Sequence, residues 1–166
     1  MAETKLHGYT VAERLNKMDV DLIELTPGTT TNACSDGEII WSNEKVANAV
    51  SVPSGTSILQ SITLIDDDDH GGAIDLVFTD SSAVLGTEGG AISASDGSIP
   101  DSILGVVTIS NYFDGVAWQV GHKQNIGMVL RGDASQDVYV HAINRSGGAL
   151  TYSAAGLFLK VGIVKD

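Results

Sequence analysis

The chain has 166 residues and carries 21 acidic against 9 basic side chains, which gives a formal net charge of −12. Because the basic residues are scattered singly, the sequence argues against the clustered Lys and Arg surface that holds nucleic-acid phosphates. A chain of this length fits one domain that buries roughly 70% of its unfolded surface. It needs no disulfide framework, and its single cysteine, Cys34, cannot form one within one chain.

Residues 1–20 are predicted to form an N-terminal arm or extension ahead of a β-domain at 21–166. They mix acidic with basic residues and lack the apolar run of a secretory signal. No window of the chain reaches the apolar length of a membrane helix. We therefore expect a protein that is made in a cytoplasm and has no membrane partner.

Within the arm, Val11, Leu15 and Met18 stand at i, i+4 and i+7, the spacing of one face of a short helix. A helix this short is marginal on its own. Two interpretations stay open: an arm ordered by a neighbouring molecule, or an element folded back on its own domain. Under the first, the apolar residues expected to contact a shell or a neighbouring copy are Leu6, Tyr9, Val11, Leu15 and Met18.

Strands are expected at 21–26 and, in pieces, between 38 and 52. The most informative stretch follows at 56–80, where two apolar runs flank a turn of four aspartates, one histidine and two glycines. Alternation with period two assigns to one face of the first run Ile58, Gln60, Ile62 and Leu64, and to the other face Leu59, Ser61, Thr63 and Ile65. Both faces are largely apolar, so we predict a hairpin in the middle of a β-sandwich.

Residues 80–102 are rich in Gly and Ser and predict a long excursion at one end of the sheets, with a single helical turn over 99–104. Further strands are expected at 105–110, 126–132, 137–145 and in the closing run from Leu150 to Asp166, within which 157–164 alternates as a half-buried strand, and an aromatic loop is expected at 111–118. The last two strands are expected to pair. About eight strands with turn signals between most of them predict an all-β fold, a single β-sandwich or jelly-roll-like domain with a short helix.

The run Asp66–Asp69 is the candidate metal site, because a hard cation takes several carboxylate oxygens from one loop. On the spacing of an EF-hand loop, Asp66, Asp68 and Gly71 fit, but His70 and Val77 stand where oxygen ligands are required. A solvated acidic turn that discourages edge pairing is therefore favoured over a calcium site. No metal or other cofactor is predicted.

The sequence contains no recognisable catalytic constellation. Its four histidines lack the close pairs of a β-barrel metalloenzyme, and neither a nucleophile elbow nor a phosphate-binding glycine loop occurs. His141 alternates with Val140 and Ala142 and is interpreted as a satisfied sheet residue. We predict a protein that is not an enzyme, and an enzyme is the least favoured alternative.

Four aromatic residues, Trp41, Tyr112, Phe113 and Trp118, could form the stacking platform of a sugar-binding module. Aromatic residues make up only 5% of the chain. A core or subunit-contact role for Tyr112, Phe113 and Trp118 is therefore favoured, since interfaces are enriched in such residues.

Three segments together resemble the capsid decoration, or cement, proteins of tailed bacteriophages: SILQSITLIDDDDHGGAIDLVFTDS, IPDSILGVVTISNYF and GLFLKVGIVKD. The resemblance implies a non-enzymatic virion protein on the capsid exterior, often a homotrimer. Such a protein binds the major capsid protein and clamps neighbouring subunits of the icosahedral shell. The main alternative is a carbohydrate- or receptor-binding β-sandwich module of a phage tail.

Overall fold

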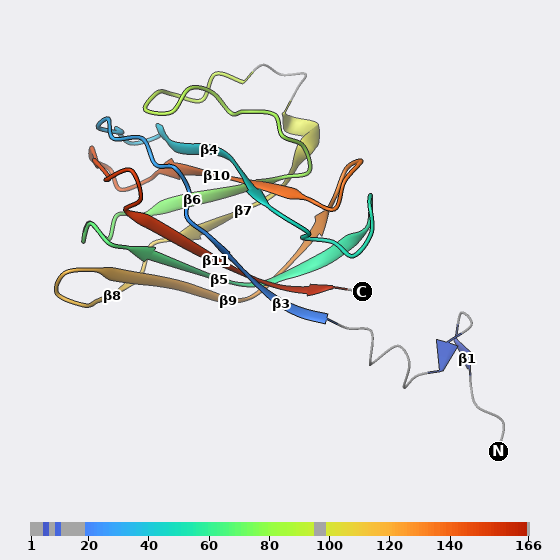
Figure 1. Cartoon of the computed structure of the whole chain (residues 1–166). Helices are drawn as coiled ribbons and strands as arrows, with labels where there is room; N and C mark the ends of the chain where they lie inside the picture. The colour runs from blue at the N-terminus through green and yellow to red at the C-terminus, as the bar shows by residue number, and fades with distance from the viewer. Residues whose placement is uncertain (1–4, 7–8, 11–18, 95–98, 166) are drawn as a thin grey trace.

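The computed structural model describes residues 5–6, 9–10, 19–94 and 99–165. Two antiparallel sheets pack face to face around the hydrophobic core, as Figure 1 shows. The predicted all-β sandwich is therefore confirmed. No helix in the described part of the chain is long and apolar enough to cross a membrane.

The upper layer in Figure 1 is a four-stranded sheet ordered β4-β10-β6-β7, and the lower layer is a five-stranded sheet ordered β3-β11-β5-β9-β8. The four-stranded sheet consists of β4 (Ile39–Val46), β10 (Val138–Asn144), β6 (Ile74–Thr79) and β7 (Ile103–Ile109). The five-stranded sheet consists of β3 (Asp19–Leu25), β11 (Leu157–Lys165), β5 (Thr56–Asp66), β9 (Gln119–Arg131) and β8 (Tyr112–Asp114). A separate short pair joins β1 (Lys5–Leu6) to β2 (Tyr9–Thr10).

The closing strand β11 shows how alternation in the sequence builds the core. Its fully buried residues are Leu157, Leu159, Val161 and Ile163. They join one cluster with residues of the opposite sheet, among them Trp41 and Phe78. Because successive side chains of a strand point to opposite faces, the residues between them lie on the outside of the sheet. The prediction of a half-buried terminal strand is confirmed.

The predicted hairpin over 56–80 is wrong. β5 pairs with β11 and β9, whereas β6 pairs with β10 and β7, so the acidic turn carries the chain from one sheet to the other. The connection, residues 67–73, is longer than the roughly two to five residues of a hairpin loop. Apolar strands can be buried either by pairing with each other or by facing each other across the core, so composition alone does not distinguish the two arrangements.

The expected faces of β5 are correct only in its second half. A β-bulge falls between Leu59 and Ser61 in the pairing with β9. As a result Leu59, Ile62 and Leu64 share the buried face, while Gln60 is exposed. One extra residue in a strand moves every side chain beyond it to the opposite face, which strict alternation cannot anticipate.

The expected pairing of the last two strands is also wrong, because β10 and β11 belong to different sheets. β11 instead lies between β3 and β5. The connection at 145–156 is held to a distant loop, where Leu150 and Cys34 exchange backbone hydrogen bonds of 2.8 and 2.9 Å. The chain therefore crosses between the sheets here too.

Two local expectations need adjustment. The helical turn is the 3₁₀ turn η1 (Pro100–Ser102), and Ile103 and Leu104 already belong to β7. The aromatic segment is not a loop throughout: Tyr112–Asp114 forms β8, which pairs with a β9 that begins at Gln119. A three-residue strand beside a Gly-containing turn carries too little alternation to be recognised.

The described residues of the long excursion, 80–94 and 99–102, arch over the outer face of the four-stranded sheet (Figure 1). Leu85 and Ile99 of this excursion pack with Ile39, Val77 and Ile143 in a second buried cluster. The outer face of this sheet is thus covered by the chain itself.

In the predicted arm, Leu6 and Tyr9 are register partners within the β1–β2 pair. Val11, Leu15 and Met18 lie outside the described residues. β3 begins at Asp19, close to the expected start of the domain.

Candidate functional site

The outer face of the five-stranded sheet is the candidate functional surface. In Figure 1 no described segment lies over this face, in contrast to the outer face of the four-stranded sheet. Strand register shows which side chains stand beside one another on it, because directly opposed residues of antiparallel strands share a face about 5 Å apart. We call it the exposed sheet face.

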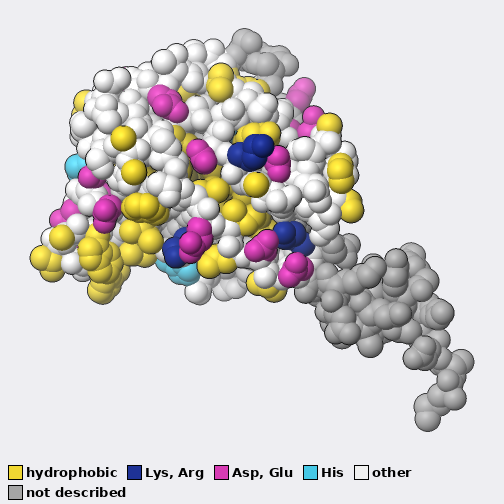
Figure 2. Space-filling model, viewed as in Figure 1, with side chains coloured by type: hydrophobic (Ala, Val, Ile, Leu, Met, Phe, Trp, Pro, Cys, Tyr) yellow, Lys and Arg dark blue, Asp and Glu magenta, His cyan; other side chains and the backbone are white. Residues whose placement is uncertain are grey.

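An aromatic row crosses one end of the exposed sheet face. Its members are register neighbours on β8, β9, β5 and β11: Phe113, Val120, Ile65 and Phe158. Phe113 is 68% exposed and Trp118 is 40% exposed. Their ring centroids lie 6.0 Å apart, so Trp118, in the turn between β8 and β9, adds a second exposed ring at this end of the face. Figure 2 shows hydrophobic side chains gathered at this end of the molecule, where β8 lies.

An aliphatic row crosses the opposite end of the same face. Its members are neighbours on β9, β5, β11 and β3: Val129, Ile58, Val164 and Val20. Val20 is 77% exposed and Val129 is 55% exposed, and Leu22 stands next to the row at 58%. Phe158 and Val164 are six residues apart on β11, so the two rows are separated by about 20 Å.

Polar residues fill the space between the rows. Lys160 Nζ donates to Glu24 Oε1 at 2.6 Å, and Thr63 Oγ1 lies 2.9 Å from His122 Nδ1. Both contacts join neighbouring strands, so they hold the polar groups against the sheet. The exposed sheet face therefore alternates apolar, polar and apolar bands, as protein contact surfaces do when an apolar patch is bordered by hydrogen-bonding groups.

The three aromatic residues singled out from the sequence separate in the structure. Tyr112 is opposite Gly121 on the inner face of β8 and packs against the core. Burial, with a smaller contribution from the Asp66 charge, raises the pKa of its hydroxyl. Phe113 and Trp118 remain exposed, so they are the aromatic residues available for a contact.

The sequence missed most residues of the exposed sheet face. Val20 lies in the predicted arm at 1–20, and Leu22 and Val129 lie in expected strands whose faces were not assigned. One signal was present, because β5 is apolar on both faces: Ile58 and Ile65 belong to the outer set. That pattern was interpreted as a strand buried in the middle of the sandwich, although it also fits a strand whose outer face meets another molecule.

The acidic turn has a structural role, because its carboxylates accept hydrogen bonds that hold the turn in place. The Asp66 side chain is buried, and its carboxylate accepts backbone N–H groups of Asp68, His70 and Gly71 at 3.1, 3.0 and 2.8 Å. Asp68 Oδ2 accepts from Ser153 N at 2.6 Å and from Ser153 Oγ at 3.0 Å. Among the described residues, no group of three or more His, Cys, Asp or Glu side chains is placed to hold a metal ion.

His141 is fully buried on β10 with hydrogen-bond partners for both ring nitrogens. Asn43 N donates to Nδ1 at 2.9 Å and Ser42 Oγ lies 3.0 Å from the same nitrogen. Nε2 lies 3.1 Å from Thr79 Oγ1. Burial lowers the pKa of this imidazole to about 4. These contacts confirm the interpretation of His141 as a satisfied sheet residue.

Comparison with known proteins adds no identification. No family model matches this chain, and no curated protein matches its sequence.

Proposed function

We propose that this chain is a virion structural protein that binds the outside of an assembled tailed-phage capsid and stabilises the icosahedral shell. The observation that carries the proposal is the exposed sheet face with its aromatic and aliphatic rows. Contiguous apolar groups that a folded domain leaves in water are characteristic of protein contact sites. The resemblance of three segments to capsid decoration proteins supports the major capsid protein as the partner.

The size of the exposed sheet face favours repeated attachment. Four strands of at least seven residues, spaced about 4.8 Å apart, together with the three-residue β8 at the edge cover on the order of 500 Å². A stable interface usually buries about 800 Å² on each partner. One copy would therefore bind weakly, and a homotrimer attached to a regular lattice would gain avidity, because the second and third contacts form at high effective concentration.

The formal charge of −12 is compatible with this role. Like-charged trimers repel one another in solution, which limits their aggregation through the apolar rows. A capsid surface that offers basic groups around its docking site would attract the protein and orient it.

Sedimentation with assembled shells tests the proposal. The purified protein is mixed with shells assembled from the major capsid protein of the same phage and pelleted, and we expect saturable co-sedimentation. Val20→Lys and Val129→Lys each place a charge in the aliphatic row, so each should weaken binding by about tenfold or more, the cost of burying an unpaired charge at an interface.

Val52→Lys is the matched control, because Val52 is exposed to a similar extent, 59%, but lies outside the exposed sheet face. It adds the same charge and should bind shells like the wild type. Absence of binding by the wild type, or equal loss in all three variants, would contradict the proposal.

A carbohydrate- or receptor-binding module of a phage tail is the second candidate. It is favoured by the exposed Phe113 and Trp118 rings, whose planes are inclined by 38°. A glycan array with the wild type and Trp118→Ala separates the two functions. Sugar binding that disappears in Trp118→Ala would support this candidate, and an array without signal would leave capsid attachment as the explanation for the aromatic row.

A further inference from the structure

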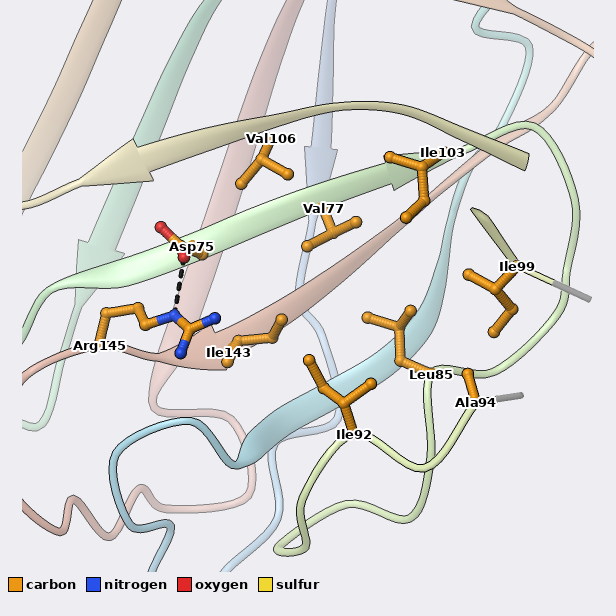
Figure 3. A pocket seen from close by; sticks show the side chains of 10 residues that line it. All are labelled: Asp75, Val77, Leu85, Ile92, Ala94, Ile99, Ile103, Val106, Ile143 and Arg145. Carbon is orange, nitrogen blue, oxygen red and sulfur yellow. Dashed lines mark hydrogen bonds and ion pairs between the residues drawn. The ribbon is translucent and has the colours of Figure 1, made fainter. Parts of the chain in front are cut away.

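A pocket of about 260 Å³ lies on the outer side of the four-stranded sheet, under the excursion that crosses it (Figure 3). Its floor is formed by β6, β7 and β10, with Val77, Val106 and Ile143 among the lining residues. Leu85 and Ala94 of the excursion form part of the opposite wall. The pocket is on the other side of the molecule from the exposed sheet face, so it is independent of the proposed attachment to a shell.

The pocket is apolar and large enough for a small molecule. Eight of its ten lining residues are aliphatic. Within the described chain no side chain fills it, and Ile103 and Val106 remain 41% and 51% exposed. An apolar cavity of about 150 Å³ already binds benzene in another protein, and ligand pockets begin near 300 Å³.

One end of the pocket is polar. Arg145 Nε donates to Asp75 Oδ2 at 2.8 Å, and Thr108 Oγ1 donates to Asp75 Oδ1 at 2.6 Å. Figure 3 shows the guanidinium group of Arg145 held beside Asp75 and directed toward Ile143. Both oxygens of Asp75 thus already accept a hydrogen bond.

The guanidinium group of Arg145 has hydrogen-bond donors that no described residue uses. Its two terminal nitrogens make no hydrogen bond with any residue that the structure describes, whereas Nε is fixed by Asp75. A guanidinium group held in one orientation, with N–H groups free, matches the two oxygens of a carboxylate. A cationic ligand would meet a carboxylate whose charge is already paired with Arg145, and a purely apolar ligand would leave the terminal nitrogens of Arg145 unused.

We propose that this pocket binds an aliphatic carboxylate, a medium-chain fatty acid. The hydrocarbon tail lies against Val77, Ile143 and Leu85, and the carboxylate accepts hydrogen bonds from the terminal nitrogens of Arg145. Burial of the tail supplies most of the affinity, because each methylene group removed from water contributes favourable free energy. The contact with Arg145 selects for the charged head group.

Titration with decanoate, below the concentration at which it forms micelles, tests the proposal by ¹⁵N–¹H correlation spectra of the full chain. We expect saturable shifts at the backbone amides of Val77, Leu85 and Ile143. Decan-1-ol, which has the same tail without the charge, should bind roughly tenfold more weakly, the effect of losing hydrogen bonds to a charged group. Arg145→Gln should reduce decanoate affinity by a similar factor without changing the affinity for decan-1-ol.

Arg131→Gln is the matched control, because Arg131 forms an equivalent ion pair with Asp80 at 3.0 Å outside the pocket. It should bind decanoate like the wild type. Ala94→Phe fills the pocket and leaves the Asp75–Arg145 pair intact, so it should abolish binding even if Arg145→Gln proves poorly folded. Decanoate shifts that do not saturate, equal binding by Ala94→Phe, or binding of a peptide ending in Ile-Leu in place of decanoate would overturn the proposal.

Discussion

His141 links the stability of the four-stranded sheet to pH. Its Nδ1 accepts the backbone N–H of Asn43, so the neutral ring carries its proton on Nε2 and donates to Thr79 Oγ1. Thr79 Oγ1 in turn donates to the Ser81 carbonyl at 2.9 Å. A second proton on the buried ring would remove the acceptor that Asn43 uses and leave a charge without solvent.

We predict that the free energy of unfolding falls as the pH is lowered from 6.5 toward 4. The folded-state pKa of about 4 lies below the ordinary value of 6.5. The unfolded chain therefore binds the proton first, and the contribution of neutral His141 is fully present above pH 6.5 and lost toward pH 4. Between pH 7 and pH 5 the loss from this group is about 2 kcal/mol, measurable by urea denaturation at each pH.

A variant that cannot titrate isolates this effect. His141→Asn retains an oxygen acceptor near Asn43 and should show a flatter pH dependence than the wild type, whatever its stability at pH 7. His122→Asn, at an exposed histidine, should retain the wild-type slope. A wild-type slope that persists in His141→Asn would assign the pH dependence to other groups.

Asp66 is the second residue whose burial has a measurable consequence. We predict that Asp66→Asn lowers the free energy of unfolding by about 1–3 kcal/mol, because an amide oxygen replaces a charged acceptor of three backbone N–H groups. Asp67→Asn changes an exposed neighbour and should have little effect. Equal effects of the two substitutions in urea denaturation would show that the turn is simply a solvated acidic cluster.

The acidic turn also marks a limit of prediction at this scale. Four consecutive aspartates do not indicate which one points inward, because that depends on where β5 ends and on how the turn reaches the second sheet. The burial of Asp66 follows from its register opposite Gln119 and Leu157 on neighbouring strands. By contrast, His141 sits in a regular alternation of apolar residues, and its role could be predicted.

At the scale of elements, alternation in the sequence predicts where strands lie but not which strands pair. β6, β7, β10 and β11 were located within a few residues from their apolar alternation. Both pairings that were inferred from adjacency along the chain are wrong, because each connection leads from one sheet to the other. Cross-strand neighbours are set by contacts that are distant in sequence, and no local pattern records them.

The close packing of β7 against β9 requires a glycine at position 121. A Cβ atom there would overlap the Ile109 methyl group and lie 2.9 Å from Tyr112 Cε1. We predict that Gly121→Ala lowers the free energy of unfolding by about 1–3 kcal/mol, the cost of overpacking a core. Thermal or urea denaturation measures the difference.

Gly148→Ala is the control for this prediction, because no atom lies within 4 Å of the position that its Cβ would occupy. It should leave stability nearly unchanged. If Gly121→Ala were as stable as the wild type, the two sheets would have to pack less closely at this end than the structure indicates.

At the scale of the whole molecule, the two outer faces differ. One is covered by the chain itself and carries an apolar pocket, and the other is left uncovered by the described residues and has apolar rows at both ends. The general architecture could be predicted from strand count and composition. The exposed sheet face could not, because outward apolar residues resemble core residues until the register of all five strands is known.

The arm is a separate prediction at this scale. We expect a chain that lacks residues 1–18 to fold, since β3 begins at Asp19 and the core lies within the two sheets. It should lose attachment to shells if the arm contacts the shell or a neighbouring copy. Circular dichroism checks the fold, co-sedimentation checks attachment, and normal attachment by the truncated chain would refute the role of the arm.

Cryo-electron microscopy of shells incubated with and without the protein tests the central claim most directly. We predict additional density on the outside of the shell in which the exposed sheet face, with Val20, Val129 and Phe113, lies against the capsid surface. Shells without added density, or density in which this face points to solvent while another face makes the contact, would contradict the account.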